Sequence, residues 1–204
     1  MENERAERLF WDAIRKSYRY NKIDWRAYNK ETHLERLTQY LSNYSKEDLI
    51  LFEKTLEEKL GALYTAEIME LSIILEGKYT KEGEKYSFDG YISTDGFIYF
   101  RCWLLLKGET FFEDITKDTE CFVSGKYHFD IGDMEAEGLL YVADAANRIA
   151  RPDDDRFAIR EAVYKQWPAI HYDNGDYQAN REPKDGTALQ EMYPKLVEEI
   201  MSIR

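Results

Sequence analysis

The chain has 204 residues, enough for one domain whose core needs neither disulfides nor metals to hold it. Its 28 Lys and Arg against 40 Asp and Glu give a formal net charge of −12, which disfavours the bulk surface as a binder of nucleic acid or anionic membranes. Aromatic residues make up 15% of the chain, against 11 Gly and 4 Pro, so wholesale disorder and collagen-like structure are excluded. A basic protein would be the electrostatically easier partner.

The sequence shows no signal for export or membrane insertion. Met1 is followed by acidic and basic residues rather than by an apolar leader. The longest apolar run, residues 102–106, is far shorter than the roughly 20 residues that a spanning helix needs. We therefore expect a cytoplasmic protein that does not contact a membrane. Cys102 and Cys121 form no Cys-x-x-Cys motif and are predicted to be free thiols.

Hydrophobic spacing predicts a series of helices in the first half of the chain. They span residues 3–17 and 29–41, a stretch that begins at Ser45 and stops near 61–65, and residues 66–75. The Ser45 hydroxyl can accept a hydrogen bond from the amide three residues on. Residues 66–75 are apolar on nearly every face, which is typical of a central helix, and Gly77 suits its C-cap.

Residues 77–92 break this helical pattern, because two glycines and alternating aromatic residues favour a long loop or a short hairpin. A helix from Ser93 to Lys107 and a short one over 109–116 follow. We then expect a helix capped by Asp133 that runs to Ile149, in which Gly138 would allow another helix to approach closely.

Beyond residue 150 the sequence becomes more polar and irregular. The acidic run 153–155 predicts a short helix to Lys165, and residues 167–185 predict an irregular stretch. A last helix should run from about 185–187 to 203, beginning late or kinking at Pro194. The predicted class is mainly α: a single multi-helix domain with an irregular C-terminal extension that ends in a helix.

Several short motifs, in this order, carry a family likeness. They are Phe10-Trp11, Leu49 with Phe52, Tyr64-Thr65, the stretch 93–105 (Ser-Thr-Asp-Gly-Phe-Ile-Tyr-Phe-Arg-Cys-Trp-Leu-Leu) and the stretch 137–143. Over about residues 8–148 the chain resembles the bacterial DUF4240 family, a domain of unknown function. The resemblance implies a helical domain over 1–150, on which an extension over 151–204 would pack. It implies no activity, substrate or cofactor.

The sequence departs from the family pattern at two places. Thr94 stands where the family typically carries the first Asp of an acidic pair, and residues 77–92 are longer than expected. If the acidic pair were functional in the family, its loss would put that function in doubt here.

Arg101 is the only charged residue between Phe97 and Leu106, on a helix that is otherwise apolar. A buried guanidinium requires a carboxylate, backbone carbonyls or a ligand anion. One hypothesis is an anion-binding or enzymatic pocket formed by Asp95 and Arg101. Phe97, Phe100 and Trp103 would form its floor. The alternative is a structural ion pair, for which Glu67 and Glu70 are candidate partners.

A second hypothesis concerns the stretch 15–30, in which bases and rings alternate. Bases that attract phosphate, together with rings that stack on bases, are typical of single-strand binding. The alternative is a solvated helix end and loop. The residues are Arg15, Lys16, Tyr18, Arg19, Tyr20, Lys22, Trp25, Arg26, Tyr28 and Lys30, with Asp24 as the single acid.

No motif for a metal, a cofactor or a nucleophile is present. The histidines, His33, His128 and His171, lack ligand spacing, and we expect neither a metal site nor a cofactor. The leading functional hypothesis is therefore a non-enzymatic protein-interaction or immunity-type module with a basic partner. The Asp95–Arg101 ligand pocket is the first alternative, and polyanion binding by Arg15–Lys30 is the weaker one.

Overall fold

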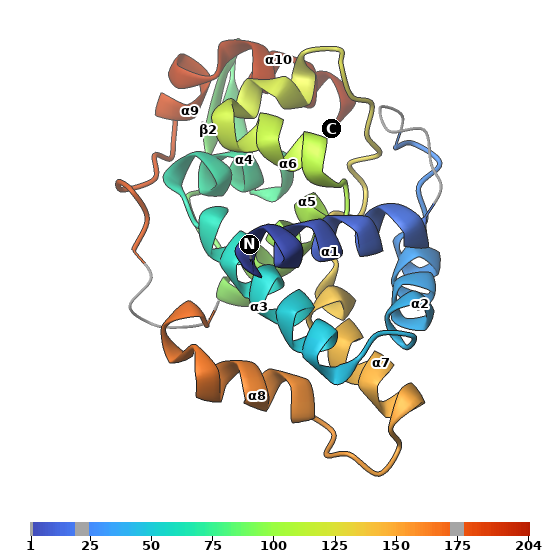
Figure 1. The fold of residues 1–204 in the computed structure, drawn as a ribbon. Helices are drawn as coiled ribbons and strands as arrows, with labels where there is room; N and C mark the ends of the chain where they lie inside the picture. Colours follow the sequence, from blue (N-terminus) through green and yellow to red (C-terminus); the bar gives the residue numbers. More distant parts are fainter. Residues whose placement is uncertain (1, 19–24, 172–177) are drawn as a thin grey trace.

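The fold was analysed in a computed structural model, which describes residues 2–18, 25–171 and 178–204 (Figure 1). The chain is mainly α-helical, with one small two-stranded sheet among the described residues, as the sequence predicts. The helices and strands are α1 (Glu2–Ser17), α2 (Lys30–Leu41), α3 (Lys46–Ala62), α4 (Ala66–Glu76), β1 (Tyr79–Glu82), β2 (Lys85–Phe88), α5 (Thr94–Leu105), α6 (Glu109–Lys117), the 3₁₀ turns η1 (Thr119–Val123) and η2 (Glu137–Tyr141), α7 (Val142–Ala150), α8 (Ala158–Gln166), η3 (Pro168–Ile170), α9 (Ala188–Met192) and α10 (Pro194–Ile203).

Helix starts follow the capping chemistry read from the sequence. The Ser45 hydroxyl accepts from the Asp48 amide at 3.1 Å, and the Ser93 hydroxyl accepts from the Gly96 amide at the start of α5. Gly77 ends α4 with an extended backbone, not a left-handed one. It must be glycine for a different reason, since a Cβ there would lie 2.5 Å from the Ile73 carbonyl oxygen.

Helices α4 and α5 lie at the centre of the fold, as their apolar faces predict. Residues 66, 68–75 of α4 and 97–98, 100–105 of α5 are buried. Helix α3 runs against α1, α5, α7 and α8, so it links the N-terminal helices to the rest of the domain. Burying apolar side chains from so many elements in one cluster supplies the main favourable free energy of folding.

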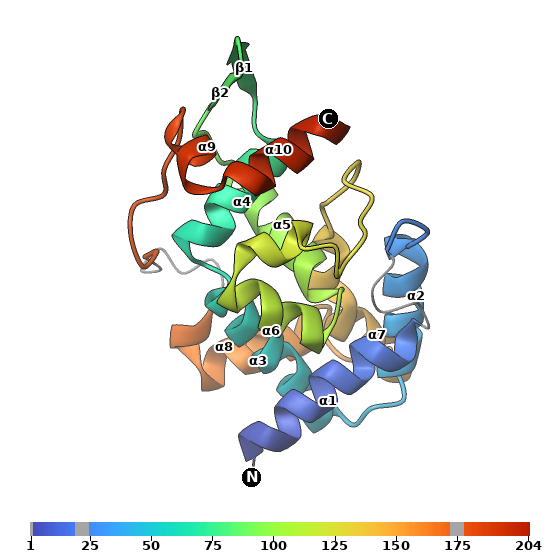
Figure 2. The same cartoon turned by 90° about the horizontal axis from the view of Figure 1, so that it is seen from above.

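The segment 77–92 forms the short hairpin that the sequence allows. Strand β1 pairs antiparallel with β2, with Tyr79 opposite Phe88 and Gly83 in the turn at a positive φ of 63°. The hairpin projects from one end of the molecule beside α9 and α10 (Figure 2). Phe88 also pairs with Gly186 through two backbone hydrogen bonds, which attach the hairpin to the C-terminal part of the chain.

The helix expected from Asp133 to Ile149 is wrong in its first part. Residues 133–136 run alongside α5, where the Ala136 amide donates to the Tyr99 carbonyl at 3.0 Å. The helical region begins only with η2 and continues as α7. Gly138 fulfils its predicted role, because a Cβ there would lie 2.9 Å from a Leu34 methyl carbon of α2.

The two helices predicted beyond residue 150 also differ in detail. Helix α8 begins at Ala158, not at 153–155, because the carboxylates there bond elsewhere: Asp154 accepts from Lys46 and Asn147. The last helical region is divided into α9 and α10 by Pro194, which cannot donate a backbone hydrogen bond. Helix α8 packs on α3 and α7, whereas α10 packs on α4 and η1.

Within the described residues, no helix combines the length and apolar character required to cross a bilayer.

Candidate functional site

Arg101 lies in the core and is 1% exposed. Its Nη1 donates to the Leu60 carbonyl at 2.7 Å and its Nε donates to the Phe97 carbonyl at 3.3 Å. The guanidinium carbon also lies 4.7 Å from the centre of the Phe97 ring and 5.1 Å from that of Tyr64. Protein groups therefore provide hydrogen bonds and ring contacts to this charge.

The other residues of the predicted Asp95–Arg101 pocket lie in different places. Asp95 is exposed in the first turn of α5 and makes no ion pair with Arg101 in the described structure. Trp103 is buried and stacks on Phe100 at 6.0 Å. Phe97 alone touches both Arg101 and the open pocket described below. A shared ligand site of these residues stays a prediction.

Glu67 and Glu70 both pair with an arginine, but this arginine is Arg181 and not Arg101. The two carboxylate oxygens of Glu70 accept from Arg181 at 2.5 and 2.7 Å, and a Glu67 oxygen accepts from it at 3.1 Å. The hydroxyl of Tyr193 donates to Glu70 at 2.6 Å. Although burial opposes ionisation of Glu70, these hydrogen bonds lower its pKa. The sequence signalled the acids but not their partner, which lies more than a hundred positions away.

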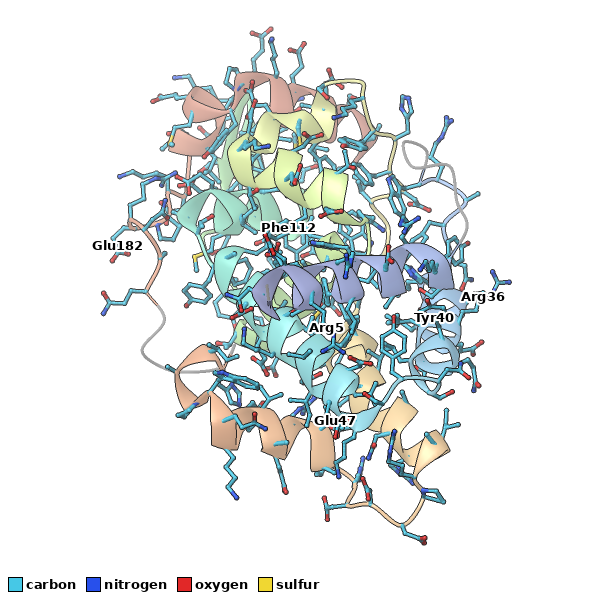
Figure 3. All side chains as sticks on the ribbon, in the orientation of Figure 1. Arg5, Arg36, Tyr40, Glu47, Phe112 and Glu182 are labelled. Atoms are coloured by element: carbon cyan, nitrogen blue, oxygen red, sulfur yellow. The ribbon has the colours of Figure 1, made fainter. Side chains whose placement is uncertain are left out.

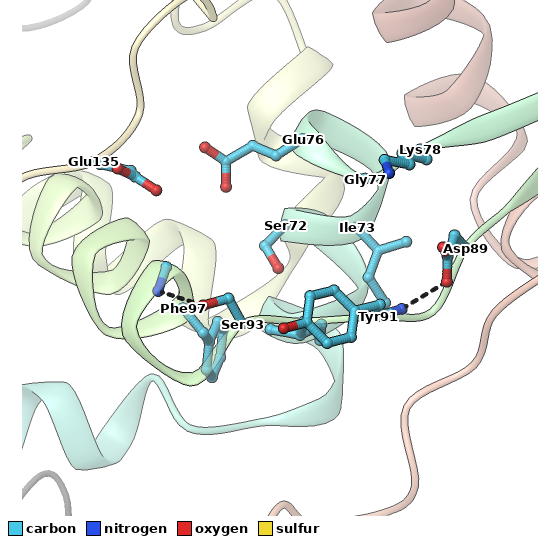
Figure 4. Close-up of a pocket in the computed structure, with 12 residues that line it drawn as sticks. Ser72, Ile73, Glu76, Gly77, Lys78, Asp89, Tyr91, Ser93, Phe97 and Glu135 are labelled. Carbon is cyan, nitrogen blue, oxygen red and sulfur yellow. Dashed lines mark hydrogen bonds between the residues drawn. The ribbon is translucent and has the colours of Figure 1, made fainter.

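An open pocket of about 310 Å³, which we call the α4–α5 pocket, lies between the end of α4, the start of α5 and the segment before η2 (Figure 4). Its floor includes the buried side chains of Ile73 and Phe97, and its rim includes Tyr91, which is 77% exposed. Sequence reasoning did not find it, because its walls come from three separate segments. The lining residues are Ser72, Ile73, Glu76, Gly77, Lys78, Asp89, Tyr91, Ile92, Ser93, Gly96, Phe97 and Glu135.

The pocket carries three carboxylates, from Glu76, Asp89 and Glu135, against one basic residue, Lys78. In the part of the chain that the structure describes, none of the three forms an ion pair. Partial burial, and then the nearby Glu135 carboxylate, raise the pKa of Glu76 to about 7. The arrangement disfavours an added negative charge and would be stabilised by a cation.

The helix geometry adds to this preference. Glu76 is the last residue of α4, where the partial negative charge of the helix end favours cations and disfavours carboxylates. The chain already places cations near this end. Arg204 donates to the carbonyls of Ile74 and Gly77, each at 2.8 Å. Lys30, which donates to the Glu135 carbonyl, opposes the rise in the pKa of Glu76. An arginine is thus accommodated at one side of the helix end, and the pocket lies at another.

Three described bases of the stretch 15–30 form ion pairs within the protein. Arg15 and Lys16 pair with Asp12, and Lys30 pairs with Asp133. Arg19, Tyr20, Lys22 and Asp24 lie outside the described residues. Polyanion binding by this stretch stays a prediction.

Two rings of this stretch face inward. The ring centres of Tyr28 and Trp25 lie 3.9 and 4.8 Å from the Lys107 ammonium, and that of Trp103 lies 4.0 Å from it. Trp25 is only 2% exposed, so its ring is not presented for stacking with a nucleobase.

The described residues hold no group of three His, Cys, Asp or Glu side chains that could bind a metal ion. Cys102 and Cys121 are free, and burial raises the pKa of both thiols, which disfavours the reactive thiolate.

Comparison with known proteins gives a family but no activity. The family model of a protein of unknown function, DUF4240, matches residues 6–148. The chain belongs to the DUF4240 family. No curated protein and no solved structure matches the chain.

Some of the residues described above lie inside the region matched by the DUF4240 model and others lie outside it. Every residue that lines the α4–α5 pocket falls inside the matched region, as do Glu67, Glu70 and Arg101. Arg181, Tyr193 and Arg204 fall outside it. Thr94 is exposed and does not line the pocket.

Proposed function

We propose that this DUF4240 protein is an interaction module whose α4–α5 pocket binds a lysine or arginine side chain of a basic protein partner. The observation that carries the proposal is the pocket itself: three carboxylates without an ion pair among the described residues, beside the end of α4. The formal charge of −12 would also attract a basic partner over a longer range. An immunity-type role, in which the module neutralises such a partner in the cytoplasm, is one form of this function.

The shape of the pocket suits one side chain better than a flat charged surface would. Ile73 and Phe97 provide an apolar floor for a methylene stem, while Glu76 and Glu135 lie where the charged end would be placed (Figure 4). Tyr91 on the rim offers an exposed ring to a cation. Lysine and arginine combine an apolar stem with a charged end, which matches this lining.

The proposal is tested by titrating the full chain with a hexalysine amide peptide, using a Gly-Ser peptide of equal length as the neutral control. Glu76→Gln and Glu135→Gln each remove one charge with little change in shape. Each should weaken binding about two- to fivefold, the range for a partly exposed charge pair. Glu198→Gln, an exposed acid on α10, is the matched control and should leave the affinity unchanged.

Salt provides a second measure of the same contact. Raising the ionic strength should weaken binding to the wild type more than to the doubly substituted protein, because fewer charges remain to be screened. Equal affinities for the wild type, the pocket variants and Glu198→Gln would contradict the pocket as the binding site.

A further inference from the structure

A segment of the C-terminal extension, residues 178–187, lies against α4 and is held there almost entirely by polar contacts. We call it the arginine strap. It contains no helix or strand apart from the isolated bridge at Gly186, and none of its residues is buried. It runs along one edge of the molecule between α8 and α9 (Figure 1), and Glu182 lies on its outer side (Figure 3). Segments with few buried apolar contacts open locally at low cost.

The arginine strap is held on α4 mainly by the Arg181 side chain and by residues next to it in the strap. Arg181 makes a two-pronged contact with Glu70 and a further bond to Glu67. Asn180 donates to Glu67 at 2.9 Å and accepts from the Ala66 amide at 2.9 Å. The Lys184 backbone amide donates to Glu70 at 2.7 Å. An extended peptide with an arginine in its middle is thus bound to the first turns of α4.

The Glu70 carboxylate, which accepts these hydrogen bonds, requires a cation beside it. The side chain of Glu70 is fully buried within the DUF4240 region, whereas the arginine that neutralises it comes from outside that region. A buried carboxylate without a cation is strongly unfavourable. The planar guanidinium suits this carboxylate better than an ammonium does, because it donates two parallel hydrogen bonds.

We propose that Glu67 and Glu70 form a guanidinium-binding site that the arginine strap fills in cis, and that an arginine on an extended segment of a basic partner protein can take the place of Arg181. This site is distinct from the α4–α5 pocket and does not depend on it. Opening the strap would uncover little apolar surface, since Ala179 is its one side chain packed against the core, and the Arg181 side chain is already 32% exposed. A second pocket, of about 420 Å³, adjoins the strap at Glu67, Asn180 and Tyr193.

The first test vacates the site in the full chain with Arg181→Ala and supplies arginine in solution. N-acetyl-arginine amide should raise the melting temperature of the variant saturably by several degrees, since it restores the missing cation. N-acetyl-lysine amide should do much less. Arg156→Ala, which removes an exposed arginine far from α4, is the matched control and should respond to either compound no more than the wild type does through its α4–α5 pocket. Absence of a saturable response in Arg181→Ala, or an equal response to lysine, would overturn the proposal.

The second test measures exchange in the wild type. A labelled peptide with the strap sequence of residues 179–184 should bind Arg181→Ala at least tenfold more tightly than it binds the wild type. With Glu76→Gln and Glu135→Gln added to remove charge from the α4–α5 pocket, binding to the protein that keeps Arg181 should still be saturable and should be lost when the peptide carries lysine in place of its arginine. No saturable binding to this protein would refute displacement of the strap. If Arg181→Ala does not fold, Arg181→Lys replaces it with the same expected order of affinities.

Discussion

Helix α4 carries two acidic sites that differ in whether the chain supplies the cation. Near its start, Glu67 and Glu70 are bound by Arg181. At its end, Glu76 faces a pocket that it shares with Glu135 and forms no ion pair with a described residue. The buried carboxylate is neutralised within the chain, whereas the solvent-accessible one is left open. Glu70 is buried, so the fold must supply its cation, whereas the more accessible Glu76 can take its cation from a binding partner.

The largest effect is expected from a substitution in the site that Arg181 fills. Glu70→Gln leaves Arg181 without its main carboxylate and should lower the free energy of unfolding by about 3 kcal/mol. Glu76→Gln changes the same residue type on the same helix. It removes repulsion from Glu135 together with attraction to Arg204 and Lys30, so it should change stability by less than about 0.5 kcal/mol. Urea unfolding at pH 7 measures both. Equal losses in the two variants would contradict the distinction between them.

Another buried acid, Glu53 on α3, sharpens the comparison through the pH dependence of stability. It is 2% exposed, and its nearest cation, Arg160, lies 3.7 Å away. Burial, followed by repulsion from Glu57, raises the pKa of Glu53 to about 8. Because the folded state holds this proton more tightly than the unfolded state, the contribution of Glu53 falls as pH rises from about 4.5 to 8.

Glu53→Gln removes this titration. Between pH 5 and pH 8, we expect the free energy of unfolding of Glu53→Gln to rise by about 2 kcal/mol relative to that of the wild type. This figure is smaller than the whole pKa difference would give, because the structure around the site can relax. Glu70 has the opposite sign: its pKa is lowered, so its contribution is present above the unfolded pKa and is lost on acidification. Urea unfolding as a function of pH measures both, and a wild-type to Glu53→Gln difference that does not change with pH would contradict the assignment.

A smaller effect tests the support around Glu70. Tyr193→Phe removes the hydroxyl that donates to Glu70 at 2.6 Å and keeps the ring. Hydrogen bonds to charged groups contribute about 1.5–3 kcal/mol, so the loss should be at the lower end of this range at this partly accessible site. Tyr79→Phe, on the exposed strand β1, serves as the control. Thermal unfolding that is unchanged by Tyr193→Phe would show that Arg181 and the Lys184 amide hold the carboxylate without the hydroxyl.

The smallest effect concerns the open site. Since the pKa of Glu76 is raised to about 7, the carboxylate gains charge between pH 6 and pH 8. Hexalysine should bind about threefold more weakly at pH 6 than at pH 8, while Glu76→Gln should show a flatter profile. A wild-type profile as flat as that of the variant would remove Glu76 from the binding site.

Local structure was the part of the fold that could be predicted from the sequence. The cap at Ser45, the start of a helix near Ser93, the central position of α4 and the close approach at Gly138 all follow from residue type and spacing. The start of the helix near Asp133 was missed because a tertiary hydrogen bond from Ala136 to Tyr99 holds that segment extended.

The candidate sites could be predicted only in part. Arg101 is conspicuous in an apolar helix, yet its carbonyl partner Leu60 carries no signal in a sequence. Glu67 was recognised as a candidate acid, but the pairing with Arg181 depends on how the extension folds back. The α4–α5 pocket joins three segments, so Glu76 and Glu135 have no sequence relationship that would connect them.

The central claim is that α4 has one acidic site closed by Arg181 and one open to a partner. It is tested most directly by following backbone amides by NMR while an arginine-containing peptide is added at low concentration to the wild type and to Arg181→Ala. The account predicts shifts at Gly77 and Gly96 in both proteins, with further shifts at Glu67 and Glu70 that appear in Arg181→Ala at peptide concentrations at least tenfold lower than in the wild type. The absence of shifts at Gly77 and Gly96, or identical responses of the two proteins, would contradict it.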